Sequence, residues 1–129
     1  MSVRVKNILG WLILVAVIGV AFFPVIRASY LNWDDPVHFL NNPFVLGGRL
    51  DAVDLFFRSS DSANRLYIPL TILTFRWEYL LFGFSPAVTH TFNLLLHGLV
   101  CCAIVLLGMS IGLSRPASFV AAIIFAVHP

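Results

Sequence analysis

Charged side chains are scarce in this sequence. Of its 129 residues, 8 are Lys or Arg and 6 are Asp or Glu, while 60% are hydrophobic. An ordinary soluble domain is about 45–50% apolar, so this composition excludes that class and indicates an integral membrane protein. The basic residues are dispersed and form no stripe or recognition motif, so the net charge of +2 does not indicate a nucleic-acid partner.

Cysteines and familiar catalytic signatures are also lacking. The only cysteines, Cys101 and Cys102, are adjacent and lie inside an apolar run, which excludes a disulfide framework and a spaced metal-binding motif. The sequence has no internal repeat, low-complexity tract, P-loop, Gly-rich dinucleotide loop or GxSxG elbow. Any chemistry must therefore come from the few polar residues between and along the apolar runs.

The first long run without a charge covers residues 8–26. As a helix rising about 1.5 Å per residue it reaches roughly 28 Å, close to the hydrocarbon thickness of about 30 Å. A cleaved signal peptide is the alternative, but its apolar region is normally about 7–15 residues long. Ile26-Arg27-Ala28 is also a poor cleavage site. The run therefore predicts a retained membrane helix.

Two further apolar runs lie at residues 88–113 and 116–129. The first predicts a second membrane helix. The other run covers only about 20 Å, whereas a span has to cross about 30 Å, which takes roughly twenty residues. We therefore expect the chain to be the N-terminal part of a longer protein. The predicted fold is an all-α fragment of one polytopic membrane domain: two complete transmembrane helices, an outer loop at residues 27–87 with short interfacial helices, and the start of a third helix.

Charge placement predicts the orientation of these helices. Every acidic residue lies within the loop: Asp34, Asp35, Asp51, Asp54, Asp61 and Glu78. Arg4 and Lys6 lie close to the first helix and Arg115 follows the second. Because basic residues near membrane helices favour the cytoplasmic side, the N-terminus is expected in the cytoplasm and the loop outside.

Two adjacent carboxylates, Asp34 and Asp35, follow the first membrane helix, inside residues 30–43. Asp35-Pro36 is typical of a helix start, with Asp35 as the cap, and the helix is expected to end at Asn42-Pro43. Asp34 lies outside the cap, where its side chain is free to bind a cation or to take part in chemistry. The alternative, that Asp35 only caps and Asp34 is merely solvated, stays open on spacing alone.

Residues 69–84 predict an amphipathic helix that ends at Gly83. Thr71, Thr74 and Glu78 share one helical face. An interfacial position is favoured, because a full span would place Arg76 and Glu78 in the bilayer, where each costs at least about 2.5 kcal/mol. The rest of the loop reads as turns at Gly47-Gly48 and residues 59–64, with a short amphipathic helix at residues 51–58.

Polar and small residues form a stripe on the second membrane helix. Its members are His90, Asn93, His97, Cys101 and Gly108, whose spacing keeps them near one helical face. The stripe must face protein or a water-filled cavity. Asn93 and His97 can serve helix packing, and His90 can contact substrate; both interpretations remain open. The two histidines alone make a poor metal site, because positions seven apart lie about 10 Å apart along the axis.

Several short motifs occur in a fixed order and carry a family resemblance. They are Tyr30-Leu31-Asn32-Trp33-Asp34-Asp35-Pro36, Asn42-Pro43, Tyr67-Ile68-Pro69-Leu70-Thr71, Leu73-Thr74-Phe75, Gly83-Phe84-Ser85-Pro86, His90, Asn93, His97 and Phe125-Ala126-Val127-His128-Pro129. In this order the chain resembles the start of GT-C membrane glycosyltransferases. It is most similar to bacterial proteins, often carrying tetratricopeptide repeats, that are related to transmembrane O-mannosyltransferases. Some members have Arg where this chain has Ile68.

The resemblance implies an enzyme of a bacterial inner membrane, with the first loop periplasmic. Such an enzyme takes a sugar from a polyprenyl-phosphate donor and transfers it to an acceptor hydroxyl, on protein. Asp34 and Asp35 would be the catalytic carboxylates, with Asp34 also the ligand of a divalent cation, Mg or Mn. His90, Asn93, Tyr67 and Arg65 would bind substrate. A carboxylate at the membrane surface suits either role, because it accepts a proton or holds a cation against a phosphate.

A function of another class fits the composition equally well. The chain is then a non-catalytic membrane scaffold or a transporter segment, in which the loop binds a partner and the polar stripe only packs. The sequence that follows Pro129 distinguishes the two, since a glycosyltransferase of this type is expected to continue through many more membrane helices.

Overall fold

A computed structural model describes residues 3–47 and 67–128, and every regular element in these ranges is a helix. The chain divides into two compact units, Met1–Arg27 with His90–Pro129, and Ala28–Thr89. Each unit is described by itself below. The turns and the helix predicted between residues 48 and 64, and the predicted substrate residue Arg65, lie outside the described residues.

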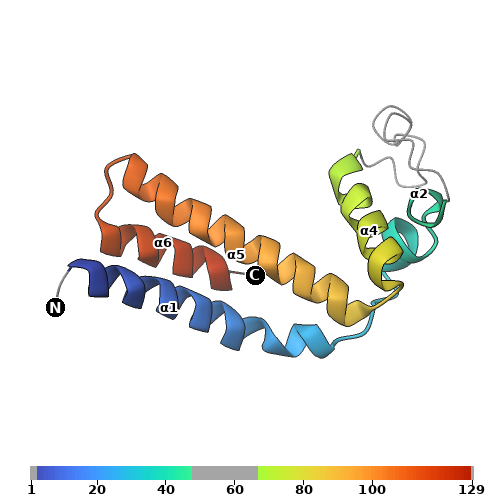
Figure 1. The fold of residues 1–129 in the computed structure, drawn as a ribbon, viewed down its shortest axis with the longest axis horizontal. Coiled ribbons are helices and arrows are strands. Elements are labelled where there is room, and N and C mark those ends of the chain that lie inside the picture. Colours follow the sequence, from blue (N-terminus) through green and yellow to red (C-terminus); the bar gives the residue numbers. More distant parts are fainter. Residues whose placement is uncertain (1–2, 48–66, 129) are drawn as a thin grey trace. The chain divides into compact units, whose positions relative to one another are not determined.

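The first unit contains the apolar helices. α1 (Val3–Phe22) continues into the 3-10 helix η1 (Phe23–Arg27), α5 spans Pro86–Ser110, and α6 spans Arg115–Val127 (Figure 1). Pro24 explains the change to 3-10 geometry, because it has no amide proton to donate to the preceding helical turn. Ile8–Arg27 and Pro86–Ser110 are long and apolar enough to cross a membrane, and α6 is a shorter apolar helix. The predicted all-α membrane fold is confirmed.

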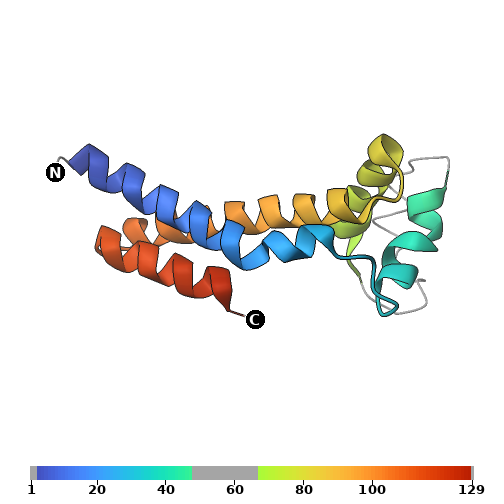
Figure 2. The same cartoon turned by 90° about the horizontal axis from the view of Figure 1, so that it is seen from below.

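Small residues let the three helices approach closely. The buried core combines residues of each helix: Leu14 and Ile18 from α1, Cys101 and Val105 from α5, and Ala122 and Ala126 from α6. A methyl group added at Gly108 would lie 2.7 Å from Ser118 Oγ, and one added at Gly10 would lie 2.8 Å from the Phe119 ring. Figure 2 shows α6 running alongside α1, and the shared core ties both helices to α5. Close packing of this kind is typical of membrane helices.

A glycine turn separates α5 from α6. α5 ends at Ser110 rather than at the expected residue 113, because Gly112 adopts a positive φ of 89°. The Leu113 amide donates to Gly108 O at 2.9 Å and the Gly112 amide to Met109 O at 3.2 Å, the pattern of a Schellman motif. Ser114 then caps α6 by accepting from the Ala117 amide at 3.4 Å.

The second unit is a small cluster of short helices. These are η2 (Pro36–Leu40), α2 (Pro43–Leu46) and α4 (Pro69–Phe82). The Asn41 amide donates to Pro36 O at 2.8 Å, which gives η2 its π-helical end. This first short helix ends at Leu40, two residues before the expected Asn42, and the Asn42 side chain starts α2 by accepting from the Phe44 amide at 2.9 Å. The chain therefore turns sharply at Asn42-Pro43 without leaving backbone donors unpaired.

Aromatic rings form the core of this unit around Phe39. Its ring centroid lies 4.9 Å from that of Phe75, 5.2 Å from that of Phe84 and 5.5 Å from that of Tyr30. Phe39, Val45 and Ile72 are fully or almost fully buried. These contacts tie the segment after the first span to α4 and fix where its acidic residues lie.

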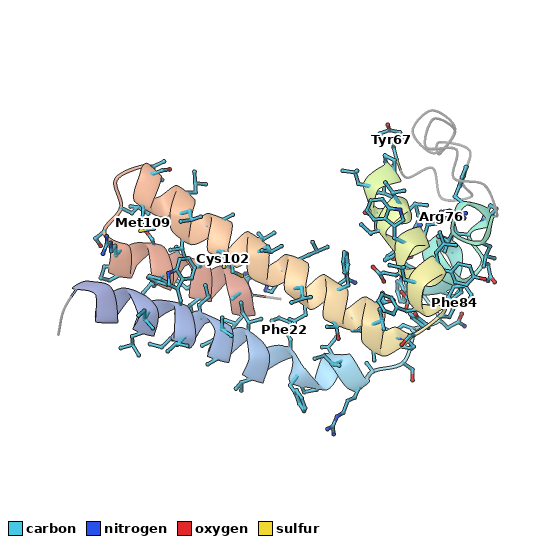
Figure 3. All side chains as sticks on the ribbon, viewed as in Figure 1. Phe22, Tyr67, Arg76, Phe84, Cys102 and Met109 are labelled. Carbon is cyan, nitrogen blue, oxygen red and sulfur yellow. The ribbon has the colours of Figure 1, made fainter. Side chains whose placement is uncertain are left out.

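The α4 helix ends where the sequence predicts, at Gly83 with φ 68°. α4 is not among the described helices that are long and apolar enough to span a membrane. Arg76 lies on the side of α4 that faces α2 (Figure 3), and its Nη1 donates to Phe44 O at 2.9 Å and to Val45 O at 3.0 Å. The buried guanidinium thus donates to two carbonyls in the last turn of α2, where helices leave carbonyls without an intrahelical partner.

Candidate functional site

Asp34 has an exposed side chain on an ordered backbone. Its carbonyl oxygen accepts from the Val37 amide at 3.1 Å and from the His38 amide at 2.9 Å, so the residue lies at the first turn of η2. Its carboxylate has no hydrogen-bond partner among the described residues, and the residue is solvent-exposed. A fixed backbone with an uncommitted carboxylate is what a base or a cation ligand requires.

Asp35 has a different role from the one predicted. The Leu31 amide donates to Asp35 Oδ2 at 2.7 Å, and the side chain makes no capping hydrogen bond to η2. The prediction that Asp35 caps the helix is therefore wrong. Its backbone is already helical, at φ −58° and ψ −41°, so its carboxylate reaches back along the chain instead. The Asp35 side chain thus closes the turn on which Asp34 lies, and a catalytic role for either carboxylate stays a prediction.

A buried polar cluster lies in the same unit and was not predicted. Tyr30 Oη and Thr89 Oγ1 are 3.2 Å apart, and Glu78 is only 4% exposed. Desolvation raises the pKa of the Glu78 carboxyl above its ordinary value, and the nearby Thr89 hydroxyl opposes this only in part. Neither Glu78 oxygen has a hydrogen bond to a described residue. Burial is the largest cause that raises the pKa of Tyr30, and the negative charges of Glu78 and Asp35 add to it. The hydrogen bond to Thr89 lowers the pKa and offsets part of this rise.

The predicted polar face of α4 is therefore divided. Thr71 is exposed and Thr74 is half-buried, with its hydroxyl donating to Thr71 O at 2.8 Å, whereas Glu78 is buried. Helical spacing correctly placed the three on one face, but the burial of Glu78 comes from tertiary packing, which that spacing does not show. The sequence did offer one signal for the burial of Glu78, because its neighbours along the chain, Trp77 and Tyr79, are aromatic.

The polar stripe of α5 meets a cavity in the first unit. This cavity, of about 420 Å³, is lined by Phe22, Val25, Ile26, His90, Asn93, Leu94, His97 and His128. His97 Nε2 donates to Ala126 O at 3.0 Å, and the His97 ring lies against Phe125 and Phe22 at centroid distances of 5.6 Å and 5.4 Å. His97 thus makes the interhelical hydrogen bond expected of a packing residue. His90 and Asn93 lie beside it on the cavity wall.

The predicted site residues fall into separate groups. Asp34, Asp35 and Tyr67 belong to the unit of residues 28–89, and His90 and Asn93 belong to the other unit. Substrate contact by His90 therefore stays a prediction. Tyr67 is 61% exposed and lies two residues before Pro69, the first residue of α4 (Figure 3). Among the residues that the structure describes, no three His, Cys, Asp or Glu side chains gather as a metal site.

Together these features define an all-α, membrane-spanning chain with an exposed carboxylate on an ordered turn shortly after its first span. The sequence of this chain is similar to those of protein O-mannosyl-transferases. Protein O-mannosyl-transferase TMTC3 of Homo sapiens is 38% identical over 71 residues, which is 55% of this chain and 8% of that protein. Protein O-mannosyl-transferase TMTC4 of Mus musculus is 38% identical over 87 residues, covering 55% of this chain and 12% of that protein.

A longer match extends the similarity over most of the chain. Protein O-mannosyl-transferase TMTC1 of Homo sapiens is 31% identical over 104 residues, which is 74% of this chain and 12% of that protein. The chain therefore spans only about a tenth of the length of the relatives it matches. No family model and no solved structure matches it. The relationship to O-mannosyltransferases that the motif order suggested is supported by these matches.

Proposed function

We propose that this chain is the N-terminal part of a GT-C membrane glycosyltransferase that transfers a sugar from a polyprenyl-phosphate donor to a hydroxyl group on protein. The similarity to enzymes named protein O-mannosyl-transferases supports a glycosyltransferase acting on protein. The donor class follows from the motif resemblance. We place the enzyme in a bacterial inner membrane, with its first loop on the periplasmic side.

The observation that carries this proposal is the contrast between the two adjacent carboxylates. Asp35 is committed to the Leu31 amide, while Asp34 next to it is exposed and uncommitted. As the acceptor oxygen bonds to the sugar carbon, the bond from that carbon to the donor phosphate oxygen breaks and polyprenyl phosphate leaves. The acceptor hydroxyl loses its proton in this step, and a carboxylate within hydrogen-bond reach accepts it. Asp34 takes this role in the proposal, and Asp35 holds the turn that aims it.

A divalent cation is compatible with the same carboxylate. Mg²⁺ is commonly bound through one or two carboxylates together with waters and substrate phosphate oxygens. An exposed, uncommitted carboxylate such as that of Asp34 fits this mode, and the metal would neutralise phosphate charge when bound. Removal of divalent cations with a chelator is expected to lower transfer, and Mg²⁺ or Mn²⁺ to restore it. Full activity in the chelator would remove the cation from the proposal.

The donor class is tested with the full-length protein in membranes. Labelled sugar is supplied either on a polyprenyl phosphate or on a nucleotide, and its incorporation into protein is measured. Incorporation from the lipid-linked sugar alone is the expected result. Incorporation from the nucleotide sugar under conditions that block lipid-linked sugar synthesis would contradict the donor assignment. If neither donor gives incorporation, a non-catalytic scaffold or transporter segment becomes the better interpretation of the chain.

A further inference from the structure

The side chain of Tyr30 joins two segments that lie far apart in the sequence. Tyr30 Oη lies 3.2 Å from Thr89 Oγ1, and the two residues are 59 positions apart. Thr89 is only 6% exposed and lies in the first turn of α5. The Tyr30 ring packs edge-on against Phe39, at a centroid distance of 5.5 Å. Both contacts lie within the unit of residues 28–89, so Tyr30 is held there at its ring and at its hydroxyl.

Asp34 lies on the stretch of chain between Tyr30 and Phe39. Tyr30 precedes it by four residues and Phe39 follows it by five. Within this stretch the Leu31 amide donates to Asp35 Oδ2 at 2.7 Å. That local hydrogen bond fixes the shape of the turn but not its place on the rest of the unit. Its place depends on the two ends: Phe39 anchors one end in the aromatic core, and the hydroxyl of Tyr30 anchors the other.

The polar groups around this anchor are not explained by stability. Glu78 lies beside the Tyr30–Thr89 hydrogen bond and is 4% exposed, and neither of its oxygens has a hydrogen bond to a residue that the structure describes. Burying such a group without a partner costs free energy, and apolar replacements are often neutral or stabilising. What a hydrogen bond adds is direction, because its strength depends on distance and angle. The Tyr30 hydroxyl thus fixes a position that apolar packing alone leaves less well defined.

We propose that Tyr30 and Thr89 are positioning residues for sugar transfer, because their hydrogen bond holds the Asp34 turn at a fixed place in the unit of residues 28–89. Neither residue touches the reacting atoms, and both act through Asp34. A displacement of about 1 Å in a reacting group can lower a rate by about 10²-fold, so this single hydrogen bond affects catalysis more than folding. This inference rests on the proposed function, in which Asp34 is the base.

Four substitutions separate the hydrogen bond from the packing around it. Tyr30→Phe keeps the ring beside Phe39 and removes the hydroxyl. Thr89→Val has a similar size and also removes a hydroxyl, whereas Thr89→Ser keeps one. Tyr79→Phe is the matched control, because it removes the same atom from another ring of the same unit, one that packs against Phe84 at a centroid distance of 4.6 Å.

The first measurement is the rate of transfer from a labelled polyprenyl-phosphate sugar, with equal amounts of full-length protein in membranes. Tyr30→Phe and Thr89→Val are each expected to lower kcat by about 10-fold to 100-fold, because the base is misplaced. The KM for the donor should change little, since the loss is in the chemical step. Thr89→Ser should keep most of the activity, and Tyr79→Phe should match the parent. Unchanged rates in Tyr30→Phe, or an equal loss in Tyr79→Phe, would overturn the proposal.

The double variant Tyr30→Phe with Thr89→Val tests whether the two residues act through one hydrogen bond. It is expected to lose no more activity than either single variant, because the second substitution then removes nothing further. Losses that multiply in the double variant would mean that the two hydroxyls act separately, and the proposal would be wrong.

Amide hydrogen exchange tests the positioning without sugar transfer. In the full-length protein in detergent, exchange at residues 28–40 is expected to quicken about fivefold in Tyr30→Phe and in Thr89→Val, as for the loss of one hydrogen bond. Tyr79→Phe should exchange there as the parent does. Unchanged exchange in the first two variants would overturn the proposal whatever their transfer rates. If exchange responds as expected but the parent transfers no sugar, the anchoring of the turn stands and the glycosyltransferase assignment fails.

Discussion

At the scale of single residues, the two unusual carboxyl groups of this chain have opposite surroundings. Asp34 is exposed and uncommitted, which suits direct contact with a substrate or cation. Glu78 is buried in the same unit, beside the Tyr30–Thr89 hydrogen bond, and has no hydrogen-bond partner among the described residues. Because burial disfavours the charged form, Glu78 holds its proton to a higher pH than an exposed carboxyl does.

The stability of the protein should therefore depend on the ionisation of Glu78. Its folded-state pKa is raised above the ordinary value of 4.5, so the native state binds the proton more tightly than the unfolded state. Stability from this group is complete below that value and is lost as the pH rises through the raised pKa. Glu78→Gln removes this dependence, because the amide does not titrate.

The measurement is the melting temperature of the full-length protein in detergent, from pH 4.5 upward. The difference between Glu78→Gln and the parent is expected to move in favour of the variant as the pH rises. A difference that stays constant across this range would contradict the assignment of a raised pKa to Glu78.

At the scale of elements, much of the helical pattern was predictable and the side-chain contacts were not. Uninterrupted apolar runs fix the two spans, and Gly83 and Asn42-Pro43 fix local ends of helices, because these signals act within a few residues. The role of Asp35 depends on whether its side chain turns forward to η2 or back to Leu31, and both are compatible with the sequence. The burial of Glu78 arises from packing within the folded unit, which the local pattern of residues does not show.

Close contact between α5 and α6 makes a prediction about two glycines of one helix. A methyl group at Gly108 would lie 2.7 Å from Ser118 Oγ, while one at Gly98 would meet nothing within 4 Å. Gly108→Ala is expected to destabilise the protein by about 1–3 kcal/mol, the usual range for overpacking. Gly98→Ala should be neutral or stabilising, by up to about 1 kcal/mol, because Ala is the better helix former.

Thermal unfolding of the two variants in the full-length protein provides the comparison. A lower melting temperature for Gly108→Ala alone is the expected outcome. Equal melting temperatures would mean that α5 and α6 are not in contact at Ser118. The readout does not depend on activity, so it tests the helix packing by itself.

At the scale of the whole molecule, the orientation in the membrane decides whether the acidic loop meets substrate outside the cytoplasm. Arg4, Lys6 and Arg115 lie near the ends of the apolar helices on the side opposite to the loop, which predicts a cytoplasmic N-terminus. Ser60→Cys and Ser114→Cys, each in a protein without Cys101 and Cys102, report the two sides. A membrane-impermeant thiol reagent on spheroplasts is expected to label position 60 and spare position 114. Labelling of position 114 alone would reverse the orientation.

The central claim is that Asp34 performs the chemistry of sugar transfer while Asp35 positions it. Asparagine keeps the size of aspartate but accepts no proton as a base and is a poor ligand for a hard cation. It still offers an oxygen to the Leu31 amide, so Asp35→Asn preserves the bond that positions the turn. The two substitutions are therefore chemically matched and differ only in the role of the carboxylate.

The decisive measurement is the initial rate of transfer from a labelled polyprenyl-phosphate sugar, in membranes that contain equal amounts of inserted full-length protein. Loss of a positioned acid–base group typically lowers a rate by about 10²–10⁴-fold, and we expect a loss of this size for Asp34→Asn. The loss for Asp35→Asn should be smaller than about tenfold, because a hydrogen-bond acceptor remains. Transfer by Asp34→Asn at the parental rate would contradict the account and leave Asp34 as a solvated loop residue.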